Sequence, residues 1–374
     1  MGDDHARARE IRHHGDHDGL LAPPPSRSGD HAPLDAIVVP TARPIAFLDE
    51  AIRLAGALDC PLVALCSGRV GAAEAMRRAP EGVRMLAVDC VRPGLPSFET
   101  SATLAGYGFE RHTDAGLKRN TALALARMLG WRRVVFLDDD MAVRRPADLP
   151  LAAGLLGPVT AVGLRNDGFP DNSVVCHAFR AVGGRQGTFI GSGALAVAVD
   201  RVTSFFPSVY NEDWFFLLED GGIGQVAAAG TVTQRVFDPY EDPERARSEE
   251  FGDCLAEGIF ALLDDGRRVS DADEEYWEQF LAARHSLIAG VLRRVPDQPA
   301  IGGATRARMA RAIRAAQERL TEITPDMCVR YLKSWQRDRD HWVDFLATLP
   351  AESVAGALRR LGLRAETTHL RRAS

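Results

Sequence analysis

The sequence predicts a doubly wound α/β fold with a mostly parallel sheet, followed by a C-terminal helical appendage. Strand-like and helix-like patterns alternate through the first third of the chain, an order that is typical of parallel sheets. The four predicted strands are 34–40, 61–68, 83–90 and 131–137. From Asp271 onward, apolar residues recur at helical spacing instead.

The remaining helices and loops are predicted from capping residues and turn composition. Thr113 or Asp114 can cap a helix over about 115–129, which Gly130 ends. Further along, the predicted segments are a Gly, Pro and Ser-rich loop at 91–112, strands at 161–167 and 173–179, a strand pair at 225–238 and a helix at 249–263. Antiparallel strands are expected among them, so the sheet should be mixed in its second half.

Three parts are expected along the chain: a disordered tail at 1–33, a main α/β domain at 34–268 and a helical region at 269–374. The tail holds five of the ten histidines and almost no apolar residues to bury. A metal bound by His13, His14 and His17 would be adventitious, and we expect a flexible tail without function.

The composition is that of an ordinary soluble globular protein. Of the 374 residues, 46% are hydrophobic and 26% are charged. No run of 18 apolar residues predicts a membrane span, and the polar N-terminus has no signal-peptide core. The six cysteines are scattered without a CxxC pair. Together these features predict a cytoplasmic protein.

The net charge of −6 is unevenly distributed. Residues 300–374 carry 14 Lys and Arg against 8 Asp and Glu. This excess indicates either contact with an acidic partner or a membrane surface, or a solvated arginine-rich helix face. No nucleic-acid partner is expected, and the apolar stripes of the C-terminal helices leave a homodimer open.

Three carboxylates, Asp138, Asp139 and Asp140, follow the fourth predicted strand without a gap. In an open α/β sheet, ligands bind beyond the carboxyl ends of the strands. Two carboxylates about 5 Å apart repel by roughly 3 kcal/mol at an effective dielectric near 20, and a divalent cation between them removes that repulsion. Carboxylate oxygens suit Mg²⁺ or Mn²⁺. The alternative is a solvated acidic turn.

Taken in their order along the chain, several sequence segments resemble those of a GT-A glycosyltransferase of the family 2 type. The resemblance covers about 35–265 and rests on VVPTARP, AGLKRNTALALARMLGW, VVFLDDDM, GSGALAVAVD and VYNEDWFF. It implies a GT-A catalytic domain, a nucleoside-diphosphate sugar as donor and an unknown acceptor. It also implies Mn²⁺ or Mg²⁺ on Asp138 and Asp140, with Asp139 at the ribose or sugar.

The resemblance assigns substrate contacts to several other positions. Thr41 and Arg43 match positions that contact the nucleoside. The residues assigned to phosphate, sugar or acceptor are Lys118, Arg119, Asn120, Gly191, Ser192, Gly193 and Trp214. Lys118 and Arg119 could equally be a solvated helix face, and Trp214 could be core.

The sequence also departs from the family pattern. Where family 2 enzymes carry an acidic residue that reads uracil, this chain has Cys66, Ser67 and Gly68. Ser67 is kept as a substrate-binding candidate, and Asp89 after the third strand could replace the missing carboxylate. A UDP-sugar is favoured, with a GDP-sugar as the alternative. The QxxRW motif of processive members is missing, which argues against a polysaccharide synthase.

Two acidic pairs are candidates for the catalytic base. Glu212–Asp213 and Glu219–Asp220 are seven residues apart, so on a helix both would share one face. Asp213 is favoured because Trp214 gives it an aromatic, partly buried setting that could raise its pKa. Glu219–Asp220 adjoins two glycines and resembles a solvated helix end.

Other readings of the same residues stay open. Inversion is preferred because no histidine falls between His177 and His285, where retaining glucosyl- and mannosyl-phosphoglycerate synthases carry a metal-binding histidine. A non-catalytic nucleotide- or glycan-binding module is a further alternative. Haloacid-dehalogenase-like phosphohydrolases and sugar nucleotidyltransferases rank lower, because Ala142 and TARP do not match their motifs.

Overall fold

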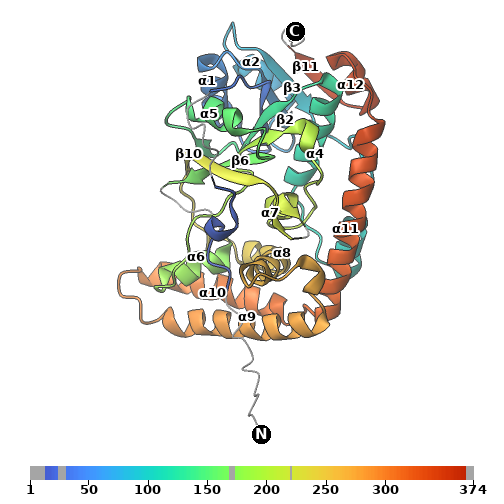
Figure 1. The fold of residues 1–374 in the computed structure, drawn as a ribbon. Coiled ribbons are helices and arrows are strands. Elements are labelled where there is room, and N and C mark those ends of the chain that lie inside the picture. The colour runs from blue at the N-terminus through green and yellow to red at the C-terminus, as the bar shows by residue number, and fades with distance from the viewer. Residues whose placement is uncertain (1–12, 24–30, 168–172, 220, 368–374) are drawn as a thin grey trace.

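The computed structural model describes residues 13–23, 31–167, 173–219 and 221–367 (Figure 1). Its main sheet has nine strands in the order β11-β3-β2-β1-β4-β7-β6-β10-β5. The strands are β1 (Ala36–Thr41), β2 (Leu62–Cys66), β3 (Met85–Asp89), β4 (Arg133–Leu137), β5 (Met141–Ala142), β6 (Ala161–Asn166), β7 (Ala194–Ala198), β10 (Val226–Gln234) and β11 (Arg364–Thr367). A separate two-stranded sheet is formed by β8 (Leu218–Glu219) and β9 (Gly222–Ile223).

The centre of the main sheet is parallel, as predicted. β1 pairs in parallel with β2 on one side and β4 on the other, and β2 pairs in parallel with β3. β7 is antiparallel to both β4 and β6, and β10 is parallel to β6. The predicted class, a mixed and mostly parallel α/β sheet followed by helices, is therefore confirmed. Its parallel strands bring Thr41, Cys66 and Leu137 to one edge.

Helices cover both faces of this sheet and extend away from it (Figure 1). They are α1 (Asp49–Ala57), α2 (Ala72–Arg78), α3 (Glu99–Tyr107), α4 (Ala115–Leu129), α5 (Asp148–Leu155), α6 (Val174–Ala181), α7 (Glu212–Leu217), α8 (Pro243–Asp264), α9 (Glu274–Arg294), α10 (Gly303–Leu320), α11 (Pro325–Thr348) and α12 (Val354–Arg360). No helix among the described residues is long and apolar enough to cross a membrane.

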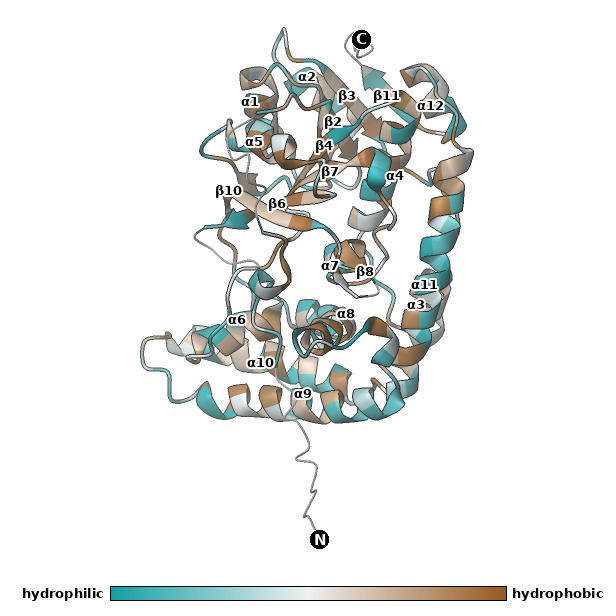
Figure 2. Cartoon of the chain, viewed as in Figure 1, coloured by the Kyte–Doolittle hydropathy of each residue, from teal (hydrophilic) through white to brown (hydrophobic). Residues whose placement is uncertain are grey.

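Alternate residues of the central strands feed two separate cores. Val38 and Phe136 point to the core that includes α4, whereas Ile37 and Val135 point to the core beside α1 and α5. This follows from the period of two in a strand. All four side chains are at most 1% exposed. In Figure 2 the central strands are coloured largely hydrophobic, whereas α9 and α11 alternate between hydrophilic and hydrophobic residues.

The C-terminal helices return the chain to the sheet. α11 runs along one side of the molecule, from α9 and α10 to α12, and packs against α3 (Figure 1). There the Asp338 carboxylate accepts hydrogen bonds of 2.8 Å from the backbone N–H groups of Glu99 and Thr100. β11 then pairs antiparallel with β3. The helical region expected at 269–374 thus ends in a strand that extends the sheet.

Three further expectations need correction. Residues 173–179 are not a strand: Ser173 caps α6 by accepting a hydrogen bond from the Cys176 N–H at 3.1 Å. The predicted loop 91–112 contains α3. The tail 1–33 is not disordered throughout, because residues 13–23 pack on the domain, with His14 and His17 at most 1% exposed. Residues 1–12 and 24–30 lie outside the described residues.

Candidate active site

A cavity of about 730 Å³ opens at the carboxyl edge of β1 and β4. It contains half of the residues predicted as site residues: Thr41, Arg43, Lys118, Arg119, Asp138, Asp139, Asp140 and Glu212. β1 and the loop after it supply the first two, the start of α4 supplies the next two, and the turn after β4 supplies the three aspartates. Parallel strand order therefore brings these distant segments together.

Cations hold each of the three aspartates. The Arg119 guanidinium lies 2.5 Å from Asp138 Oδ1, and the Arg43 guanidinium lies 2.8 Å from both Asp139 Oδ1 and Asp140 Oδ2. The Thr41 hydroxyl also donates to Asp139 at 2.7 Å. The run is thus a constrained set of carboxylates at the cavity wall, and not a free acidic turn.

The start of α4 is buried and does not form the solvated face that was the alternative. Lys118 is 1% exposed, and its Nζ donates to Thr41 O at 2.8 Å and to Ser67 Oγ at 2.7 Å. Arg119 is 3% exposed and bridges Asp138 to Glu212. Burying two cations costs several kcal/mol each unless they are paired. The acids of the site supply those partners.

A smaller cavity of about 110 Å³ adjoins the same edge and contains Asp213. Its walls also include Asp138, Gly191, Gly193 and Trp214. Asp138 therefore faces both cavities and connects the aspartate run to the predicted base.

Asp213 is held in a fixed orientation at the start of α7. Its Oδ2 accepts the Ser192 N–H at 2.9 Å, and its Oδ1 accepts the Trp214 N–H at 3.0 Å. Gly191 is required here, because a Cβ at that position would lie 2.4 Å from Asp213 Oδ2. Asn211 precedes the helix at φ 60°, a left-handed conformation that asparagine tolerates better than most residues.

Burial raises the pKa of several carboxyl groups of the site, among them Asp138, Asp139 and Asp213. Desolvation, with a contribution from Glu212, raises the pKa of Asp213. Desolvation also raises the pKa of Asp138 to about 7, against the opposing charge of Arg119. The side chain of Asp138 still keeps 31% of its surface exposed toward the cavities. A raised pKa at Asp213 agrees with the aromatic setting expected from Trp214, which is 3% exposed.

Four predicted site residues are not in the walls of either cavity. Ser67 accepts a hydrogen bond from Lys118, and the Ser192 N–H donates one to Asp213, so each serine contacts a side chain that lines a cavity. Asn120 bonds the backbone of Phe206 with both of its amide atoms. Asp89 accepts the Ala72 N–H at 2.7 Å at the start of α2. These hydrogen bonds give Asn120 and Asp89 structural roles.

The competing acidic pair is not on the helix of Asp213. α7 ends at Leu217, and Glu219 lies on β8 as an exposed residue. The expectation that both pairs share one helical face is therefore wrong. Asp220 lies outside the described residues.

Several cavity residues were not predicted. Phe47 lies under the guanidinium groups of Arg43 and Arg235, at 5.3 and 4.3 Å from its ring centre. Arg111 lies 3.9 Å from Glu212 and over the ring of Tyr210. No motif marks these residues in the sequence, since they come from a short 3₁₀ helix at Ile45–Leu48 and from loops that only the fold brings to the site.

The carboxylates suit a divalent cation. Asp138 and Asp140 offer hard oxygen ligands, and burial of Asp138 with too little positive charge is what raises its pKa. Among the described residues, however, no three carboxylates of this site converge within 4.8 Å. A metal on Asp138 and Asp140 would therefore need ligands from substrate phosphates and water, which is usual for Mg²⁺.

No family model and no curated protein matches the chain. Among solved structures, it is similar to the mannosyltransferase PcManGT from Pyrobaculum calidifontis in complex with GDP-Man and Mn²⁺. The identity is 16%, the TM-score is 0.43, and the similarity covers 86% of this chain and 87% of that one. At this level of similarity, the function has to be inferred from the site.

Proposed function

We propose that the chain is a metal-dependent GT-A glycosyltransferase, which moves a hexose from a nucleoside-diphosphate sugar to an acceptor hydroxyl. The observation that carries the proposal is that Asp138 lies in the walls of both cavities. It connects a set of carboxylates suited to a metal with Asp213, a carboxylate of raised pKa. Displacement at a sugar carbon needs a stabilised leaving group and a base on the acceptor.

The charge of the larger cavity favours metal dependence. Six cationic side chains and nine carboxylates line it. A diphosphate would meet excess negative charge there, so a divalent cation must accompany it. Bound on Asp138 and Asp140, Mn²⁺ or Mg²⁺ would supply Lewis-acid stabilisation of the charge on the leaving diphosphate.

The donor is assigned to the larger cavity and the acceptor to the smaller one. Thr41, Arg43 and Phe47 form the side of the larger cavity that fits a nucleoside, since the Phe47 ring and two guanidinium groups offer surfaces for stacking. A UDP-sugar remains the first choice and a GDP-sugar the second. Asp89 is not assigned to the nucleobase of the donor, because its carboxylate is hydrogen-bonded at the start of α2.

Transfer would proceed with inversion. Asp213 takes the proton of the acceptor hydroxyl while the oxygen of that hydroxyl forms a bond to the anomeric carbon. The bond from that carbon to the diphosphate breaks on the opposite side, and the electron pair leaves with the diphosphate. The N–H groups of Ser192 and Trp214 fix the carboxylate for this step. Glu212 supports the site through its 2.6 Å ion pair with Arg119 and is not assigned as the base.

Release of nucleoside diphosphate from a panel of nucleotide sugars would test the proposal. The purified protein should hydrolyse or transfer at least one UDP- or GDP-sugar with Mn²⁺, and chelation should abolish the reaction. Metal-dependent binding without any turnover would indicate the binding module instead. Equal turnover with and without the chelator would contradict the proposal.

A further inference from the structure

Residues 13–17 are held inside the molecule, although the proposed reaction does not use them. The ring of His17 is fully buried, 4.6 Å from the ring of Trp214, and its Nδ1 accepts the Ile190 N–H at 2.9 Å. Gly15 O accepts a 2.8 Å hydrogen bond from the Gly187 N–H. These contacts fix the place of His13, the first described residue.

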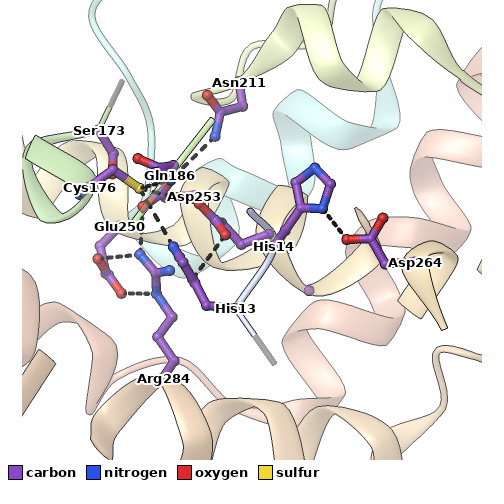
Figure 3. A network of polar contacts seen from close by, with 12 residues as sticks. His13, His14, Ser173, Cys176, Gln186, Asn211, Glu250, Asp253, Asp264 and Arg284 are labelled. Atoms are coloured by element: carbon purple, nitrogen blue, oxygen red, sulfur yellow. Dashed lines mark hydrogen bonds and ion pairs between the residues drawn. The ribbon is translucent and has the colours of Figure 1, made fainter. Parts of the chain in front are cut away.

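His13 lies beside Cys176 of α6 (Figure 3). It also pairs with Glu257 of α8. Its Nδ1 lies 3.0 Å from Glu257 Oε2, while Cys176 Sγ lies 3.3 Å from Glu257 Oε1 and 3.9 Å from His13 Nε2. These three distances involve both ring nitrogens of His13 and both carboxylate oxygens of Glu257, whereas an ion takes one atom from each residue. Ligand atoms that share a tetrahedral zinc ion are separated by about 3.3 to 3.8 Å. One donor atom from each residue lies within 4.8 Å of the others, which no other group of three such side chains achieves among the described residues.

The same region of α8 buries more carboxylates than cations. Glu250, Asp253 and Glu257 are at most 1% exposed. Arg284 pairs with the first two, at 2.6 Å to each, which leaves His13 as the direct ionic partner of Glu257. A buried carboxylate needs a paired cation. A divalent ion beside Glu257 would supply that charge and would also stabilise a Cys176 thiolate.

We propose that His13, Cys176 and Glu257 form a transition-metal site, separate from Asp138 and Asp140, that takes Zn²⁺ or a similar ion. A nitrogen, a thiolate sulfur and a carboxylate oxygen select such an ion, whereas Asp138 and Asp140 offer oxygen alone. On binding, the Cys176 thiol releases its proton to solvent and the sulfur bonds to the metal.

Gln186 provides a candidate fourth ligand. Its Nε2 lies 3.2 Å from Cys176 Sγ, and its Oε1 is buried without a hydrogen-bond partner among the described residues. Rotation of the amide by a half turn exchanges the two atoms and turns the oxygen toward the site. The bound ion would then fix the N-terminal segment to α6 and α8, and would hold His17 against Trp214 in the wall of the smaller cavity.

Titration of the metal-free full-length protein with Co²⁺ tests this site without an activity assay. A cobalt–thiolate bond gives a near-ultraviolet charge-transfer band, which should saturate at one equivalent and disappear when Zn²⁺ is added. Cys176→Ser should lose the band, and His13→Ala should weaken Co²⁺ binding by more than about tenfold. Cys254→Ser is the matched control, because Cys254 is an equally buried thiol on α8. That variant and Asp138→Asn should both keep the band.

The absence of a band in the wild-type protein would overturn the proposal. So would a band that persists in Cys176→Ser, or one that is lost in Cys254→Ser or Asp138→Asn. If Cys176→Ser does not fold, as judged by circular dichroism, His13→Ala decides the question, since His13 is the least buried of the three ligands. Unchanged Co²⁺ affinity in that folded variant would contradict the site. None of these outcomes depends on whether the protein transfers sugars.

Discussion

Replacement of Asp213 by asparagine tests the assignment of the base. The amide is nearly isosteric and can accept one of the two N–H groups of Ser192 and Trp214, but it cannot take a proton. A positioned general base contributes about 10² to 10⁴ in rate, so the barrier should rise by about 3 to 5 kcal/mol. Donor binding should change little, because Asp213 lies in the smaller cavity and the donor is assigned to the larger one.

Initial rates measured over a range of donor concentrations separate these two effects. Turnover should fall in Asp213→Asn while the apparent donor affinity stays within about threefold of the wild-type value. Glu219→Gln serves as the matched control, since Glu219 is an exposed carboxylate on β8. Normal turnover in Asp213→Asn would refute the assignment of the base. Loss of donor binding in that variant would refute the division of the site between the two cavities.

Three further outcomes are expected. Because the pKa of Asp138 is raised to about 7, protons compete with the metal for this carboxylate below pH 7. The Mn²⁺ affinity measured by calorimetry should therefore rise about tenfold per pH unit up to pH 7 and then level off, and an affinity that does not change with pH would contradict this. Arg284→Met leaves Glu250 and Asp253 buried without their partner, which should cost about 3 to 5 kcal/mol and lower the calorimetric melting temperature by about 4 to 6 °C. An unchanged melting temperature would refute the stabilising role of Arg284. Burial lowers the pKa of His17 well below 6.5, so below that pH the unfolded chain binds a proton that the folded chain does not, and stability should fall by up to about 1.4 kcal/mol per pH unit. In denaturant titrations His17→Phe should remove this contribution to the pH slope, and an identical slope in the variant would show that His17 is not buried as a neutral ring.

The sequence predicted the parts of the fold that local patterns encode. The four parallel strands and α4, with Gly130 at its end in a left-handed conformation, follow from apolar periodicity and end signals. The aspartate run was found because it directly follows a buried strand. Asp213 was singled out by its aromatic neighbour, and the structure places it in the wall of the same cavity as Asp138.

Other features depend on contacts between distant segments, which no single-sequence pattern records. His14 and His17 were assigned to a disordered tail because polar composition alone does not reveal rings buried against Trp214 and Phe260. The 173–179 segment has the composition of a strand, yet the Ser173 cap and packing on α8 make it a helix. The sequence left open whether Lys118 contacts substrate or lies on a solvated helix face, since its buried partners come from β1 and the turn after β2.

Isothermal titration of UDP and GDP into the protein, with Mn²⁺ and with a chelator, tests the central claim most directly. At least one of the two nucleotides should bind with Mn²⁺ and lose at least about tenfold in affinity in the chelator, because the acidic cavity repels a bare diphosphate. Asp138→Asn and Asp140→Asn should each abolish the metal-dependent part while the protein stays folded. Full affinity in the chelator, or metal-dependent binding that survives in both variants, would contradict the assignment of this edge as the metal and diphosphate site.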